Sequence, residues 1–182
     1  MKLKSIFILA AITLASVAFI LDKKGLKDDK TTSKITYHCV HSLHDWYGTN
    51  KNVDCVVVYD DAANAIDKVA VSGKVADFDS DDSNRDSHGL EVLEALQYPK
   101  VTFSSTGIVA NGNNLKISGN LTFHGVTKAI TFDAAREDKD KQISVKGGFS
   151  ILLSDYKIER PSFMLMQMDD KTEIAFTMIF NK

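Results

Sequence analysis

The chain has 182 residues, 44% of them hydrophobic, and a formal net charge of −2. This length allows one domain with a sizeable hydrophobic core and gives no reason to expect two. Because there is no excess of basic residues to neutralise phosphates, the charge argues against a nucleic-acid-binding protein.

The first residues have the layout of an export signal, in which two lysines precede the apolar run Ile6–Leu21. This run is shorter than the ~20 residues that comfortably span a bilayer. We therefore expect residues 1–21 to be a signal peptide that directs the protein to the periplasm or out of the cell, or a membrane anchor if it is not cleaved. Residues 22–34 are charged and polar, which predicts a flexible leader before a folded domain at 35–182.

From Ile35 onward, apolar residues alternate with polar ones at the period of half-buried antiparallel strands. This alternation predicts strands at 35–43, 53–60, 66–77, 101–109, 115–124, 128–135, 142–153 and 172–180. Short turns join the later strands, among them Asn111-Gly112, which tolerates the positive φ of a tight hairpin. Strands joined in this way are neighbours in space, so the second half of the chain is expected to be a meander.

One helix is predicted between the third and fourth strands. Leu90, Leu93 and Leu96 recur at a spacing of three, Ser83 is placed to cap the first turn, and Pro99 prevents continuation. A lone amphipathic helix of this kind is expected to cover one end of a sheet.

Eight antiparallel strands are enough to close a barrel, whose interior is either filled by side chains or holds one small ligand. The predicted fold class is therefore all-β, an eight-stranded antiparallel barrel with one covering helix. One face of the strands is almost wholly apolar and is expected to point inward. The opposite face, with residues such as Thr102, Thr131 and Glu173, is expected to meet water.

Four segments resemble the YceI-like family of exported, lipocalin-like proteins. They are SNRDSHGLEVLEALQYPKVTFSS (83–105), LKISGNLTFHGVTKAITFDA (115–134), LSDYKIERPSF (153–163) and TEIAFTMIF (172–180). The Arg-Asp-x-His start of the helix, the Tyr-Pro before a Thr-Phe strand and the Gly-x-Leu-Thr-x-x-Gly-Val-Thr-Lys run carry the resemblance, which covers residues 35–182. It implies a lipocalin-like barrel that holds an isoprenoid lipid or a quinone lengthwise inside.

The inward-facing apolar side chains supply the predicted ligand contacts. They are Leu93, Phe103, Leu121, Phe123, Ile130, Phe132, Phe149, Ile151, Phe176 and Met178. Burying each methylene is worth about 0.8 kcal/mol, so a few prenyl units supply useful affinity without a strong headgroup contact. In the alternative, the phenylalanines fill this space and form an ordinary core.

Arg85, His88 and Arg160 are charged groups in the matched segments, and they have two interpretations. In one, they form a polar collar at the barrel mouth that meets an anionic or carbonyl headgroup. In the other, Arg85 or Arg160 pairs with Asp86 and pins the helix onto the sheet. The second is favoured because caps and ion pairs are common near helix starts.

Cys39 and Cys55 lie on the first two predicted strands. In an oxidising compartment they are candidates for a cross-strand disulfide. The alternative is a pair of buried free thiols.

Two segments contain residue types that bind metals. In HCVHSLHDW (38–46), Cys39 and His41 face one side of an extended strand and His38 faces the other, so the ligands diverge. The alternate methionines of SFMLMQMDD (162–170) suit Cu(I), but methionine is more often a pliable apolar filler. We expect neither a metal site nor a cofactor other than a bound lipid.

The sequence has no Gly-x-Ser-x-Gly elbow, no His-Glu-x-x-His and no glycine-rich phosphate loop, so we expect no enzymatic activity. The leading hypothesis is an exported binding protein whose partner is an isoprenoid or quinone-type lipid, with transient membrane contact. One alternative is a packed structural or stress-response module with a protein partner. Another is a periplasmic metal binder.

Overall fold

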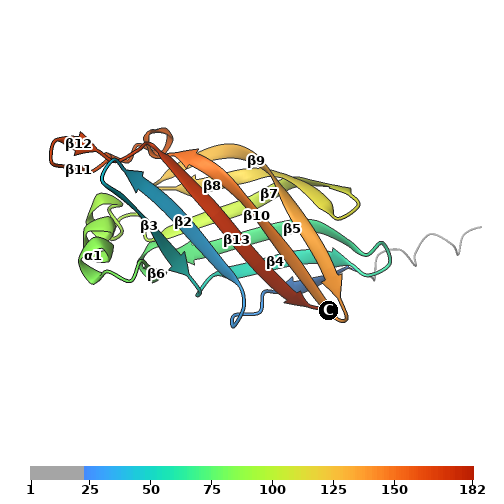
Figure 1. Cartoon of the computed structure of the whole chain (residues 1–182). Coiled ribbons are helices and arrows are strands. Elements are labelled where there is room, and N and C mark those ends of the chain that lie inside the picture. Colours follow the sequence, from blue (N-terminus) through green and yellow to red (C-terminus); the bar gives the residue numbers. More distant parts are fainter. Residues whose placement is uncertain (1–22) are drawn as a thin grey trace, which may run out of the picture.

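Most of the protein is one antiparallel sheet of eleven strands, seen in a computed structural model that describes residues 23–182 (Figure 1). The expected signal segment lies outside these residues. The strands are β1 (Lys23–Lys27), β2 (Lys34–His41), β3 (His44–Asn50), β4 (Asp54–Asp60), β5 (Ala65–Lys74), β6 (Phe78–Asp79), β7 (Lys100–Asn111), β8 (Asn114–Phe123), β9 (Val126–Lys139), β10 (Gln142–Leu152), β11 (Ser162–Phe163), β12 (Met166–Gln167) and β13 (Lys171–Asn181). Their order across the sheet is β1-β4-β5-β7-β8-β9-β10-β13-β2-β3-β6, and β11 and β12 form a separate hairpin.

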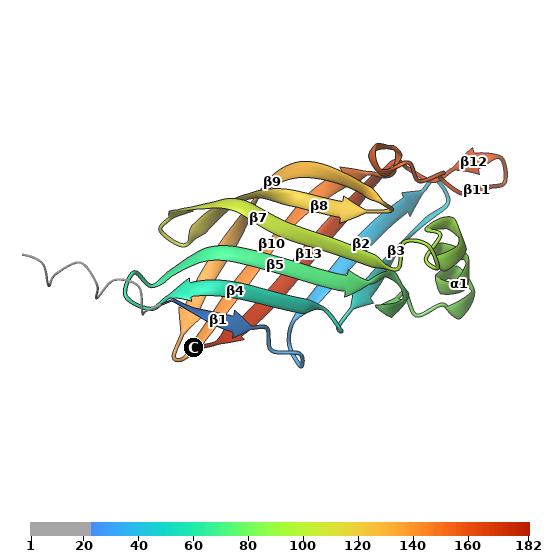
Figure 2. The ribbon, with the colours of Figure 1, turned by 180° about the vertical axis from the view of Figure 1, so that it is seen from behind.

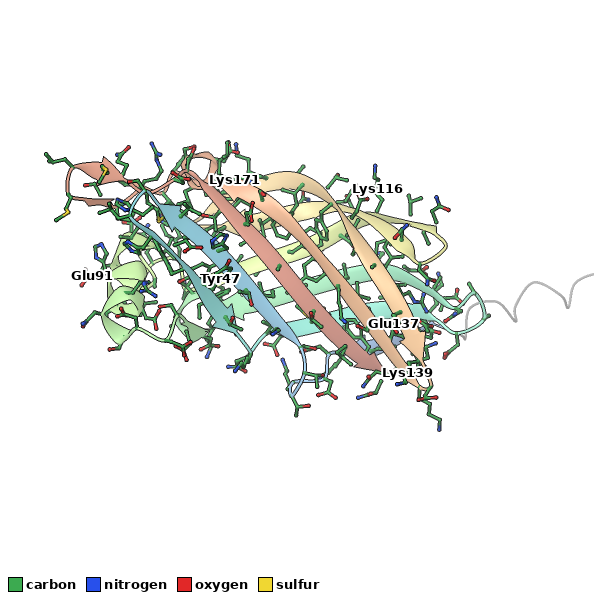
Figure 3. The ribbon with its side chains drawn as sticks, in the orientation of Figure 1. Tyr47, Glu91, Lys116, Glu137, Lys139 and Lys171 are labelled. Atoms are coloured by element: carbon green, nitrogen blue, oxygen red, sulfur yellow. The ribbon has the colours of Figure 1, made fainter. Side chains whose placement is uncertain are left out.

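Alternation of side chains decides which face of the sheet is buried. On β8, Leu115, Ile117 and Leu121 are buried, whereas Lys116 and Asn120 are exposed. Figure 3 shows the outward direction of Lys116. Because side chains of a strand point alternately to its two faces, the same sequence pattern repeated along the meander β7-β8-β9-β10 creates one apolar and one polar surface.

The sheet curls until one edge meets its middle. Asp28, just after β1, forms an isolated antiparallel bridge with Phe180 of β13. The strands β2, β3 and β6 continue the sheet beyond β13. The result is a half-barrel with the helix α1 (Ser83–Val92) and the β11–β12 hairpin at one end and the C-terminus at the other (Figure 1 and Figure 2).

The antiparallel, mostly β fold with one covering helix is confirmed among the described residues, but the eight-stranded barrel is wrong. The sheet has three further strands, β1, β3 and β6. The predicted flexible leader contains β1, whose single large apolar residue, Leu26, is buried. The segment predicted as one strand at 35–43 is instead part of a hairpin, because β3 begins three residues after β2 ends.

The helix starts and ends differently from the prediction. Asp82 is its cap, since this carboxylate accepts hydrogen bonds from the backbone N–H groups of Asn84 and Arg85. The helix ends at Val92, so Leu96 lies beyond it and is fully exposed. In residues 23–182, no helix combines the length and apolar character needed to cross a bilayer.

Contacts at both ends of α1 hold it over the half-barrel. The Asp86 carboxylate accepts a hydrogen bond from the Ser80 hydroxyl at 2.6 Å, which ties the first turn to the preceding loop. After the helix, the Glu94 carboxylate lies 2.9 Å from His124 Nε2 in the β8–β9 turn. In the same turn, a Cβ atom on Gly125 would lie 2.6 Å from the Tyr98 ring, so only glycine lets the chain after α1 pack this closely.

Ionic contacts join β9 to the C-terminus at the end opposite α1. Asp138 Oδ1 accepts from Arg136 Nε at 2.7 Å, and its second oxygen lies 2.7 Å from Lys182 Nζ. The Arg136 and Lys182 cations also lie 5.9 and 5.5 Å from the ring centroid of buried Tyr59. Hydrogen bonding from Arg136, supported by Lys182, lowers the pKa of Asp138 to about 2.

Replacing Asp138 with asparagine is expected to lower Tm at pH 7 by about 2–4 °C, corresponding to on the order of 1 kcal/mol for a partly exposed network. The pKa of Asp138 lies below the ~3.9 of an unfolded aspartate, so its stabilisation is present above that value and is lost as pH falls toward 2. The Tm values of the parent and of Asp138→Asn should therefore approach each other as the pH is lowered from 7 to 2, which thermal unfolding measures. Asp133→Asn, at an exposed position on the same strand, is the control; an Asp138→Asn deficit that persists at pH 2 would contradict the assignment.

Candidate ligand-binding cavity

A cavity of about 320 Å³ lies inside the curled sheet. Small-molecule sites commonly have volumes of ~300–1,000 Å³. Along β8 the lining runs from Leu115 to Phe123, which is about 26 Å at ~3.3 Å per residue. The apolar side chains therefore leave an interior space instead of packing into a solid core.

Nine of the ten predicted contact residues line this cavity. They are Leu93, Phe103, Leu121, Phe123, Phe132, Phe149, Ile151, Phe176 and Met178. The tenth, Ile130, instead borders a separate hollow between β9, β10 and the turn Leu153–Tyr156. Contact of these side chains with a ligand stays a prediction.

Four phenylalanines form an aromatic cluster on the cavity wall. The Phe132 ring lies 5.5, 5.0 and 5.6 Å from the rings of Phe103, Phe149 and Phe176, respectively. A Cβ atom on Gly119 of β8 would come within 2.4 Å of the Phe103 ring. Glycine at this position thus lets the ring lie close to the sheet, which keeps the aromatic side chains beside the wall.

Some residues that line the cavity were not among the predicted ligand contacts. Trp46 lines the cavity from β3, a strand missing from the prediction. Gly48, two residues further along β3, is also buried, so the side chains alternate between the two faces, and this alternation in the sequence could have revealed the strand. Tyr37 of β2 also lines the cavity and packs against Phe78 at 5.6 Å.

Both cysteines are free, buried and part of the cavity lining, so the disulfide alternative does not apply in this structure. Burial raises the pKa of Cys55 to about 12 and also raises that of Cys39. Burial likewise raises the pKa of Tyr37 to about 12. These three side chains are therefore neutral at physiological pH and add no charge to the wall.

The mouth beside α1 has two of the three predicted polar residues. Arg85 and His88 line the cavity. The Arg85 guanidinium lies 5.6 Å from the Trp46 ring centroid, donates to the Ser80 carbonyl at 3.2 Å and lies 3.4 Å from Asp82. Its ion pair is therefore with Asp82, not with Asp86 as the structural interpretation supposed.

Arg160 does not line the cavity. Its guanidinium donates to the Met168 carbonyl at 3.2 Å and to Gln167 Oε1 at 3.0 Å. Arg160 thus holds the base of the β11–β12 hairpin. Only Arg85 and His88 remain candidates for a polar collar.

The histidines and methionines do not converge in the part of the chain that the structure describes. Within residues 23–182 there is no group of three or more His, Cys, Asp or Glu side chains placed to hold a metal ion. His38 Nε2 lies 2.8 Å from Asp45, on the outer face. Met168 is buried on the cavity wall while Met164 is 70% exposed, because the chain turns between them.

Large apolar side chains are exposed in three loops around the α1 end. We call Leu43, Leu96, Met164 and Leu165 the apolar rim; they are 55%, 104%, 70% and 103% exposed. Met164 and Leu165 form the two-residue turn between β11 and β12, with φ of 50° and 64°. Left-handed backbone costs a residue with a side chain roughly 1–2 kcal/mol, and such turns usually contain Asn-Gly.

Comparisons with known proteins agree with this architecture. The YceI-like domain family matches residues 27–180. The protein YceI of Escherichia coli O17:K52:H18 is 32% identical over 134 residues, covering 69% of this chain and 70% of that protein.

Two solved structures are similar in fold. Burkholderia cenocepacia BcnA has a TM-score of 0.75 at 22% identity, covering 84% of this chain and 98% of that one. A polyisoprenoid binding domain from Saccharophagus degradans, implicated in plant cell wall breakdown, has a TM-score of 0.66 at 13% identity, covering 86% and 97%. With the family match extending over nearly the whole described structure, this chain belongs to the YceI-like domain family.

Proposed function

We propose that this protein is an exported, non-enzymatic binding protein that holds an isoprenoid lipid or a quinone tail in its apolar cavity. The observation that carries the proposal is the 320 Å³ interior space, lined along the length of β8 by apolar side chains. The related polyisoprenoid binding domain from Saccharophagus degradans supports the choice of ligand class. In this role, the protein carries or sequesters the lipid between membrane and water.

The chemistry of the wall suits a hydrocarbon chain. A five-carbon prenyl unit gains roughly 4 kcal/mol gross on burial, so a few units give micromolar affinity after the costs of association. Tyr37, Cys39 and Cys55 stay neutral in the wall, and so a tail in contact with them meets no buried charge.

A headgroup would lie at the α1 end, where Arg85 and His88 line the cavity. Arg85 is already engaged by Ser80 and Asp82. Its contact with a quinone carbonyl or an anionic group therefore orients the ligand more than it strengthens binding.

Export is the part of the proposal that depends on residues 1–21, with their lysines and apolar run. A cleaved segment leaves the protein in the periplasm or secreted. A retained segment anchors the same domain to the membrane, beside a source of isoprenoid lipid.

Prenyl-quinone binding is expected to quench the fluorescence of Trp46, which is the single tryptophan of the chain and lines the cavity. Titration with a quinone that carries two prenyl units should saturate at micromolar concentration. The same quinone ring without a prenyl tail is the control and should not saturate in this concentration range, because the tail supplies the affinity.

Mass spectrometry of an organic extract of the purified protein should also find a prenyl lipid in near-stoichiometric amount. Empty extracts, together with no quenching of Trp46 by added prenyl quinone, would overturn the proposal.

Phe132→Trp is expected to weaken prenyl-quinone binding by about tenfold, because the larger ring extends from the aromatic cluster into the cavity. Thr131→Trp places the same ring on the exposed face of β9 and should leave affinity unchanged. Quinone retained after gel filtration, measured by absorbance, gives the affinity without interference from the added tryptophan. Comparable retention by both variants, with Tm values near that of the parent, would show that Phe132 does not determine binding.

A further inference from the structure

We infer that the apolar rim inserts into the surface of a lipid bilayer and docks the cavity mouth on the membrane. This inference goes beyond the proposed function, because it assigns a second binding surface whose occupant is the bilayer itself. Docking is also measurable without any cargo in the cavity.

The turn between β11 and β12 is the starting observation. Its two positions have φ of 50° and 64°, and they are occupied by Met164 and Leu165 in place of the Asn-Gly that such a turn favours. The same two side chains are 70% and 103% exposed. Backbone strain and exposed apolar surface thus coincide at one tip, a combination that costs stability in water and points to a partner for the tip.

The rim is held in place at the mouth. The Met166 carbonyl lies 3.1 Å from His41 Nε2, and the Ser42 hydroxyl donates to Met166 Sδ at 3.2 Å. These contacts join the β11–β12 hairpin to the β2–β3 turn, from which Leu43 protrudes. Figure 1 and Figure 2 both show this hairpin, the β2–β3 turn and α1 at the same end of the half-barrel.

The rim is continuous with the cavity. Met168 follows the hairpin and is buried in the cavity wall. Leu90 of α1 and Leu93, which caps its C-terminal end, line the same space. A hydrocarbon chain that leaves a bilayer under the rim therefore meets apolar side chains on its way into the cavity. This path avoids exposure of the chain to water.

The charges around the rim favour a bilayer without a net negative surface. The segment 157–171 balances three basic with three acidic side chains: Lys157, Arg160, Lys171, Glu159, Asp169 and Asp170. The outer side of α1 adds acidic Glu91 (Figure 3). These described segments around the rim contain no basic cluster that would attract anionic lipid. Insertion of the apolar tips is therefore the attractive contribution, and vesicle binding should depend only weakly on salt concentration.

A bilayer suits this surface better than a folded protein partner. The rim residues lie on three separate loops, and each is more than half exposed. A protein partner would need a surface shaped to all of the tips, whereas the interfacial zone of a bilayer accepts each one individually.

The test compares phosphatidylcholine vesicle binding by the protein as exported and by two variants with the same N-terminus. Met164→Asn combined with Leu165→Gly supplies the residues that the turn favours, so Tm should be unchanged or higher while vesicle affinity falls by at least about tenfold. Val109→Asn is the matched control, because Val109 is 67% exposed on β7 at the end away from α1. Its vesicle affinity should equal that of the parent.

A tryptophan reporter makes the test independent of any retained N-terminal anchor. With Leu165→Trp, vesicles should shift the added emission to the blue, and brominated phosphatidylcholine should quench it; Val109→Trp should show neither effect. An unchanged Leu165→Trp spectrum, or equal vesicle affinity of the tip variant and the parent, would overturn the inference. Light scattering could also overturn it. A parent protein that is dimeric and does not bind vesicles, and that becomes monomeric with the tip substitutions, would assign the rim to a protein contact.

The same samples separate this inference from the proposed function. The tip variant should bind a water-soluble, short-chain prenyl quinone within about twofold of the parent, since the cavity wall is intact. Tip insertion without quinone binding would leave docking standing and remove the carrier role. Quinone binding without tip insertion would leave the carrier role standing and remove docking.

Discussion

Asp28, just past the edge strand β1, bridges to Phe180 on β13 and so joins one edge of the sheet to its middle. This closure turns a two-faced sheet into an inside and an outside, and the apolar face becomes the inside. Side chains on such a curved wall pack mainly against neighbours on adjacent strands, as the Phe132 cluster shows. Because these side chains do not reach across the half-barrel, a space remains in its middle, and its apolar wall suits a hydrocarbon tail.

The two ends of the half-barrel are built from different interactions. Around Asp138, ion pairs and the buried ring of Tyr59 tie β9 and the C-terminus together. At the other end, α1 lies over the opening and is held there by Asp86 and Glu94, while the surrounding loops expose apolar side chains. Ionic contacts suit a permanent closure in water. An exposed apolar mouth suits a surface that exchanges hydrophobic material with a membrane.

Alternation along the chain predicted the meander and most of the cavity wall, because side chains of a strand point to opposite faces whatever the rest of the fold does. Phe103, Phe123 and Phe132 were therefore assigned to the lining from sequence. For Cys39 and Cys55, the sequence allowed either a disulfide or two free thiols. The positions of β2 and β4 in the curled sheet leave both thiols free.

What the sequence by itself determined was local: strand periodicity, the tight turns, the single helix and the family resemblance. The tertiary structure decided the number of strands, since β1 has only Leu26 to mark it and becomes a strand by pairing with β4. It also decided that Ile130 lies outside the cavity lining and that Arg160 holds a hairpin. Curvature, edge pairing and empty volume depend on contacts between residues far apart in the chain, and no local pattern of residues specifies them.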